Sequence, residues 1–378
     1  MLTAFFGAIF NIIFEGMALL THIGTLGFAI IVFTLVTRLL MTPLQIKQQR
    51  STRMMSKLQP EMKAIQDKYV NRKDQQSQMQ QSQEMQALYK KYNVNPFAGC
   101  LPLLIQLPLI YALYAVLRQP SKYITKLAEL YSLIASTIEA TVSDIGIKLT
   151  ALIAEYPMSS TAQLELSKID IPSTADYISN FTTQQWAALM EVAPELNGVL
   201  TQLLQQKSDY EYFLFNLVDA PSQLVSSGNY LAFIVPILAG ASTFIFSKIT
   251  MAQSRPTPSP DAQENPAESV AKTMNIMMPI MMGFFSYTVP SGLALYWIAG
   301  NLIMMGQQIW VGRLVAKEMT ALDEQLERER AERTGPKKKR KKRPPQEGGA
   351  TNSGQVSVNG SNGSGAEKVR KERKQPGK

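Results

Sequence analysis

The chain alternates between five apolar stretches and polar segments that are dense in charge. A helix needs about 20 residues to cross about 30 Å of hydrocarbon. The pattern predicts spans at residues 22–42, 96–117, 230–249, 274–289 and 293–311. Pro290-Ser291-Gly292 separates the last two, and Pro followed by Gly favours a tight reversal between helices. We therefore expect an all-α membrane protein whose last two spans form a hairpin.

Residues 1–21 are apolar but carry a polar stripe. Thr3, Gly7, Asn11 and Glu15 recur at every fourth position and share one face of a helix. This pattern predicts an amphipathic helix lying in the outer membrane interface, with a sixth span as the alternative. The segment lacks a basic start and an A-x-A site, so we do not expect a cleaved signal peptide.

Residues 43–95 are rich in Gln and predict a helical hairpin. Leu58, Met62 and Ile65 are spaced for one helix face, and Met85 and Leu88 repeat the pattern. We expect a reversal at 70–74 and a bend or division of the first helix at Pro60. The hairpin suits either a docking arm for partners or a solvated connection between spans.

The formal net charge of +9 is unevenly distributed. Residues 43–95 and the tail 312–378 are basic, whereas residues 118–229 are acidic. The positive-inside rule places the basic segments and the loop 250–273 in the cytoplasm, with the N-terminus outside. Residues 118–229 then form an outer insertion, in which 131–156 and 183–204 are compatible with helices.

Few residues suit covalent or metal chemistry. Cys100 and His22 are the only Cys and His of the chain, which excludes an intramolecular disulfide and a Cys or His metal cluster. No GxxxxGK[ST] motif occurs, and the spans hold no protease-like set of catalytic residues. We expect no enzyme activity, no cofactor and no metal.

Arg38 is the most informative residue, because it lies inside the first apolar stretch. A guanidinium in hydrocarbon costs at least about 2.5–3.5 kcal/mol. The side chain must therefore reach the interface or face water inside the protein. The residue pattern alone leaves both possibilities open.

A methionine stripe occupies one face of the predicted fourth span. Its positions follow the i, i+3, i+4, i+7, i+8 spacing and are Met274, Met277, Met278, Met281 and Met282. Flexible Met side chains suit varied apolar partners. The stripe therefore indicates either ordinary packing and lipid contact or a surface that contacts apolar substrate segments.

Four motifs resemble the YidC family of membrane protein insertases, which includes the mitochondrial Oxa and chloroplast Albino proteins. The motifs are TRLLMTPL at 37–44, LQPEM at 58–62, NPFAGCLPLLIQLP at 95–108 and VPSGLALYW at 289–297. The resemblance covers roughly residues 15–117 and 212–313. It implies five transmembrane helices around a hydrophilic groove that is open to the cytoplasm. The insertion 119–229 is longer than the linker usual in the family, and the resemblance assigns it no role.

The resemblance also implies site residues and a function. The groove residues would be Arg38, Thr34 and Trp297, with Gln106 and Asn301 as further polar positions. The implied function is a membrane protein insertase and chaperone of the bacterial cell membrane, acting on nascent membrane proteins alone or with the Sec translocon. A small-solute or ion transporter using Arg38 as a substrate or gating charge is the alternative, although no inverted repeat supports it.

The tail carries a dense basic run followed by a Gly- and Ser-rich segment that is typical of disorder. The run is Lys337, Lys338, Lys339, Arg340, Lys341, Lys342 and Arg343. Such runs bind polyanions. The resemblance favours ribosomal RNA as the partner, and anionic phospholipid or a solvated tail are alternatives.

Overall fold

The computed structural model describes residues 2–70, 72, 74–95, 101–155, 171–254 and 266–334. The chain separates into two units, Met1–Glu324 and Gln325–Lys378, and the account below concerns the first. Within the described residues every named element is a helix. Cys100 and the predicted polyanion-binding run 337–343 lie outside them.

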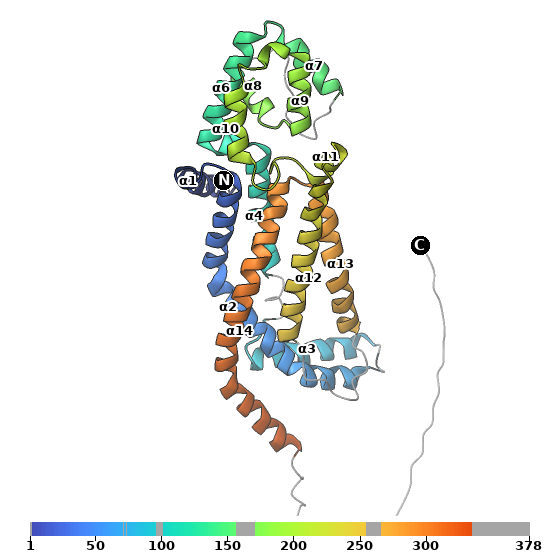
Figure 1. Cartoon of the computed structure of the whole chain (residues 1–378). Helices are drawn as coiled ribbons and strands as arrows, with labels where there is room; N and C mark the ends of the chain where they lie inside the picture. The colour runs from blue at the N-terminus through green and yellow to red at the C-terminus, as the bar shows by residue number, and fades with distance from the viewer. Residues whose placement is uncertain are drawn as a thin grey trace, which may run out of the picture. The chain divides into compact units, whose positions relative to one another are not determined.

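One helix coincides with each of the five predicted spans. These helices are α2 (Thr25–Tyr69), α4 (Leu101–Arg118), α12 (Ile234–Ser254), α13 (Pro266–Thr288) and α14 (Ser291–Thr334). In Figure 1, α12, α13, α14 and the first part of α2 run in a common direction. Three described segments are long and apolar enough to cross a bilayer, namely Thr3–Leu20, the helix Thr25–Tyr69 and Tyr230–Ala252. The described part of the chain is therefore a helical membrane protein.

Helix α1 (Leu2–Leu20) lies across the other helices, and Figure 1 shows it nearly end-on. Its buried Phe10 packs edge-to-face on Phe33 of α2, with ring centroids 5.5 Å apart. The polar stripe faces protein, because Asn11 accepts a hydrogen bond from the Thr125 backbone N–H at 2.9 Å. Length and composition also suit a span, so the crossing orientation is the feature that favours an interfacial helix.

The predicted hairpin consists of the second part of α2 and helix α3 (Gln75–Lys91). The Asp74 side chain caps α3 by accepting from the Ser77 backbone N–H at 2.9 Å. Helix α2 is not divided at Pro60, because an exposed Pro removes one backbone hydrogen bond without leaving buried groups unpaired. Figure 1 shows α2 changing direction along its length before it meets α3.

The described residues of 118–229, which are 118–155 and 171–229, form a helical subdomain at one end of the bundle (Figure 1). Its elements are α5 (Pro120–Tyr123), α6 (Thr125–Thr141), α7 (Ile145–Glu155), α8 (Ile171–Ile178), α9 (Thr183–Val192), the 3₁₀ turn Pro194–Leu196, α10 (Thr201–Glu211) and α11 (Pro221–Ser226). The helix-compatible run 183–204 is interrupted, because Pro194 cannot continue α9 and Gly198 adopts φ +88°. One apolar core connects this subdomain with α1, α2, α4 and α14.

Candidate functional site

Arg38 lies on α2 between two threonines spaced one helical turn away on the same face. Thr34 is fully buried, and its hydroxyl donates to the Ile30 carbonyl at 2.6 Å. The Thr42 hydroxyl donates to the Arg38 carbonyl at 3.1 Å. A hydrogen bond from a Thr hydroxyl to the backbone carbonyl one turn earlier satisfies that hydroxyl within an apolar helix. The sequence thereby builds a polar stripe on a helix that otherwise suits hydrocarbon.

The Arg38 guanidinium points toward α14 at Gly300. A Cβ atom at Gly300 would lie 3.1 Å from Nη2 and 3.7 Å from Nε of Arg38. The absence of a side chain at Gly300 therefore creates the space that the guanidinium occupies. Arg38 Nε is buried without a hydrogen-bond partner in the described residues. No carboxylate in that part of the chain lies within ion-pair distance of Arg38.

Tyr296 and Gln307 of α14 add further polar groups to those of Thr34, Arg38 and Thr42. Together with Gln106 of α4, these residues form what we call the polar surface. The buried Tyr296 hydroxyl accepts a hydrogen bond from Gln106 Nε2 of α4 at 2.7 Å, and Tyr296 lies near Arg38. Gln307 Nε2 donates to the Arg38 carbonyl and the Thr42 hydroxyl, each at 3.0 Å. Side chains from α4 and α14 therefore join a connected set of polar groups that includes Arg38 and Thr42 of α2.

Sequence reasoning missed Tyr296, Gly300 and Gln307, although a signal was present. Their spacings of four and seven residues put all three on one face of α14. A small residue between two hydrogen-bonding side chains on that face leaves room for a side chain from another helix, which is that of Arg38 in this structure.

The other predicted groove residues are placed differently. Asn301 Nδ2 donates to Ser242 Oγ at 3.1 Å and to Thr243 Oγ1 at 3.0 Å, so it joins α14 to α12. Trp297 is half-buried, and within the described residues it makes no ring contact with Arg38. Of the five residues, Arg38, Thr34 and Gln106 therefore share one polar surface.

The methionine stripe is largely accessible. Met277, Met278 and Met281 are exposed, whereas Met282 is buried, and the side chain of Met274 lies outside the described residues. Helices α12 and α13 approach closely beside it, since a Cβ at Gly240 would lie 3.2 Å from the Pro279 carbonyl oxygen. The stripe thus offers a flexible apolar surface on one side of this helix pair.

Residues 18–318 match the family model described as "60Kd inner membrane protein". The chain belongs to this family. Membrane protein insertase YidC 1 of Halalkalibacterium halodurans is 29% identical over 302 residues, covering 79% of this chain and 75% of the relative. Membrane protein insertase YidC of Clostridium perfringens is 30% identical over 331 residues, covering 86% and 95%. Membrane protein insertase MisCA of Bacillus subtilis is 28% identical over 295 residues, covering 76% and 73%.

The family match confirms the resemblance drawn from the four motifs. It also spans more of the chain than those motifs do, because it includes the insertion 118–229. All residues that meet around Arg38 lie within the matched region. The polar surface on α2, α4 and α14 is therefore part of the segment shared with the 60Kd inner membrane proteins.

Proposed function

We propose that this chain is a non-enzymatic membrane protein insertase and chaperone, and that Arg38 binds the hydrophilic tail of a nascent membrane protein. One observation carries the proposal. The guanidinium is half-buried beside Gly300, its Nε has no partner among the described residues, and no carboxylate there balances its charge. An uncompensated charge inside apolar helices is a functional feature by default. The curated relatives carry the name of the same function.

The proposed insertion process requires electrostatic attraction between Arg38 and the client tail but no covalent step. A positive charge in a partly buried site attracts an acidic tail more strongly than it would in water. The groove around Arg38 shortens the hydrocarbon path that a polar segment must cross. The client's apolar segment meanwhile enters lipid and gains about 0.8 kcal/mol per buried CH₂ group. Apolar transfer then drives insertion without nucleotide hydrolysis.

The proposed topology determines the side of the membrane on which the groove opens. Five spans with the N-terminus outside and the C-terminus in the cytoplasm would place the groove opening on the cytoplasmic side. The methionine stripe would contact apolar client segments while they pass into the bilayer. The Sec translocon is the proposed partner for larger clients.

Substitution of Arg38 tests the groove charge. Arg38→Ala should impair insertion of clients with acidic tails, whereas Arg38→Lys should keep part of the activity because it keeps the charge. The assay measures protease protection of clients synthesised in an insertase-depleted strain. Full complementation by Arg38→Ala would contradict the proposal. Crosslinks from Thr34 and Trp297 to stalled nascent chains would support it.

The basic run 337–343 is the proposed ribosome-binding segment. Its seven Lys and Arg residues would contact ribosomal RNA with strong salt dependence. Cosedimentation of full-length and tail-deleted protein with ribosomes tests this role. Equal cosedimentation of the two proteins would assign the run to anionic lipid or solvent instead.

The transporter alternative receives no support from the comparisons. A transporter would move a small solute across liposomes in an Arg38-dependent manner without any client protein. Such transport by the purified chain would favour that function over insertion.

A further inference from the structure

One stretch of the outer insertion, Asp209–Asp219, holds the start of α2. The Gly24 backbone N–H donates to the Asp209 carbonyl at 2.7 Å. The Phe213 ring lies directly on Gly27 of α2 and on Gly24 just before it, since a Cβ at Gly27 would lie 2.5 Å from the ring and one at Gly24 would lie 2.9 Å from it. Phe213 also packs edge-to-face on Phe28, with centroids 5.1 Å apart. We call this stretch the outer clasp.

The outer clasp also caps the start of α14. The Ser291 backbone N–H and hydroxyl both donate to the Asp219 carbonyl at 2.8 Å. The Gly292 backbone N–H donates to the Leu217 carbonyl at 2.8 Å. The first N–H groups of a helix have no partner within the helix, so these carbonyls supply what α14 lacks. The outer clasp therefore makes hydrogen bonds at the starts of both α2 and α14, the two helices that are in contact at Arg38 and Gly300.

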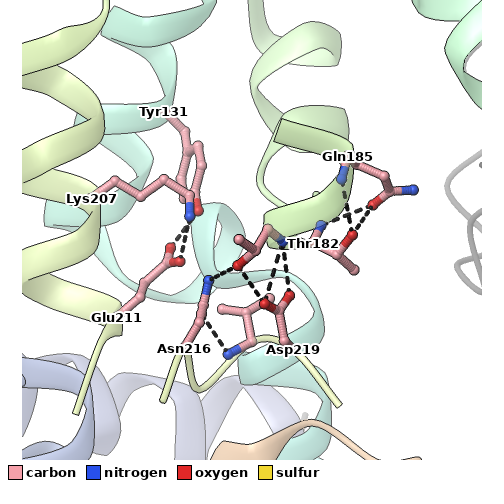
Figure 2. A network of polar contacts seen from close by, with 9 residues as sticks. Tyr131, Thr182, Gln185, Lys207, Glu211, Asn216 and Asp219 are labelled. Atoms are coloured by element: carbon pink, nitrogen blue, oxygen red, sulfur yellow. Dashed lines mark hydrogen bonds and ion pairs between the residues drawn. The ribbon is translucent and has the colours of Figure 1, made fainter. Parts of the chain in front are cut away.

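A buried polar network anchors the clasp in the insertion (Figure 2). The Asp219 carboxylate accepts from the Thr183 backbone N–H at 3.1 Å and from the Thr183 hydroxyl. At the other end, buried Glu211 pairs with Lys207 at 2.8 Å and accepts from the Tyr131 hydroxyl. Breaking one member of such a network leaves a buried polar group unpaired, which is costly. The network therefore keeps the clasp in one conformation.

We propose that the outer clasp is a positioning element for insertion, setting the distance between α2 and α14 at the Arg38–Gly300 contact. Arg38 is about 21 Å along α2 from Gly24, and Gly300 is about 14 Å along α14 from Ser291, at 1.5 Å per residue. Packed helices move as stiff units, so a displacement at the clasp is carried to the guanidinium. The inference rests on the proposed role of Arg38 and gives the outer insertion a function.

Two opposite changes at the contact between Phe213 and Gly27 test the outer clasp. Gly27→Ala crowds the Phe213 ring, and Phe213→Leu removes the ring but keeps an apolar side chain. Gly16→Ala is the matched control, because nothing lies within 4 Å of its added Cβ. Each full-length protein is reconstituted into liposomes, and insertion of an acid-tailed and a neutral-tailed client is measured by protease protection. Membrane-integrated protein normalises each rate.

The expected result is selective for the charged client. Both clasp variants should lower insertion of the acid-tailed client by about twofold to thirtyfold and spare the neutral-tailed one. In an Arg38→Ala background they should cause no further loss, because the group they position is gone. Gly16→Ala should behave as wild type.

Three outcomes would contradict the reasoning in different ways. Equal losses for both clients, or losses that multiply with that of Arg38→Ala, would assign the clasp a purely structural role. Wild-type rates for both clasp variants would show that α2 and α14 keep their spacing without it. Unchanged acid-tailed insertion by Arg38→Ala alone would overturn the groove charge itself, and this inference with it.

Discussion

Filling the space at Gly300 should separate groove function from protein stability. Gly300→Ala places a methyl carbon 3.1 Å from Arg38 Nη2, closer than ordinary van der Waals contact, so the guanidinium must move by a few tenths of an ångström. The same change favours the helix, because Ala is better than Gly in a helix interior by about 0.5–1 kcal/mol. Insertion should therefore fall while thermal stability does not.

The size of the effect follows from the geometry. A guanidinium and a client carboxylate 4 Å apart attract by about 4 kcal/mol at an effective dielectric constant of about 20. Moving the charge away by about 0.5 Å weakens this attraction by about 0.5 kcal/mol, which corresponds to about twofold in affinity. Gly300→Leu fills the space of the guanidinium and should lower acid-tailed insertion as far as Arg38→Ala does.

The assay compares insertion of acid-tailed and neutral-tailed clients in proteoliposomes, with thermal unfolding of each variant in detergent. Gly306→Ala is the control on the same helix, since nothing lies within 4 Å of the added Cβ. It should gain the same helix propensity and keep wild-type insertion. Wild-type insertion of the acid-tailed client by Gly300→Leu would refute the placement of the working charge at this contact.

Three further changes test the hydrogen bonds between α14 and α2, the buried ion pair of the insertion, and a buried tyrosine of the insertion. Gln307→Leu removes hydrogen bonds to α2, including that to Thr42, and should lower thermal stability in detergent by about 0.6–1.7 kcal/mol, from the average to the maximum measured for such bonds between membrane helices. Lys207→Met leaves Glu211 buried without its cation and should cost about 3–5 kcal/mol in denaturant unfolding, whereas Lys207→Met combined with Glu211→Leu should recover most of it. Burial raises the pKa of Tyr177 to about 12, so the folded state keeps a proton that the unfolded state loses, and stability should fall between about pH 10 and pH 12. Tyr177→Phe should make that fall shallower and raise stability at neutral pH by about 1 kcal/mol, because the buried hydroxyl has no partner among the described residues.

The motifs and hydrophobic pattern predicted the family and the helical class. A long apolar stretch indicates a helix that suits hydrocarbon, and an Arg within it indicates a candidate site, because both signals depend on solvation rather than on detailed packing. The reversal between α2 and α3 was predicted for a similar reason. Asp74 caps α3 through contacts that lie within four residues of sequence.

The partners of Arg38 could not be predicted in the same way. Gly300 and Tyr296 lie more than 250 residues further along the chain, and their significance depends on which face of α14 meets α2. The placement of Asn301 against α12 depends on that same rotation of α14. Polar residues on one helix can serve two different neighbours, and composition does not distinguish them.

The free-energy cost of removing the Arg38 guanidinium from water bears on which groups lie beside it. A resident carboxylate beside the guanidinium would lower the desolvation cost, but it would also occupy the charge that an acidic client would need under the proposed function. The described structure instead places neutral groups near Arg38: Tyr296 lies close to it, Gln307 binds its backbone carbonyl, and Gly300 leaves room beside it. In its proposed role, the outer clasp fixes the helices that carry these groups through its hydrogen bonds to Gly24, Ser291 and Gly292. Under this proposal, the insertion supplies rigidity to the site and α2 supplies its charge.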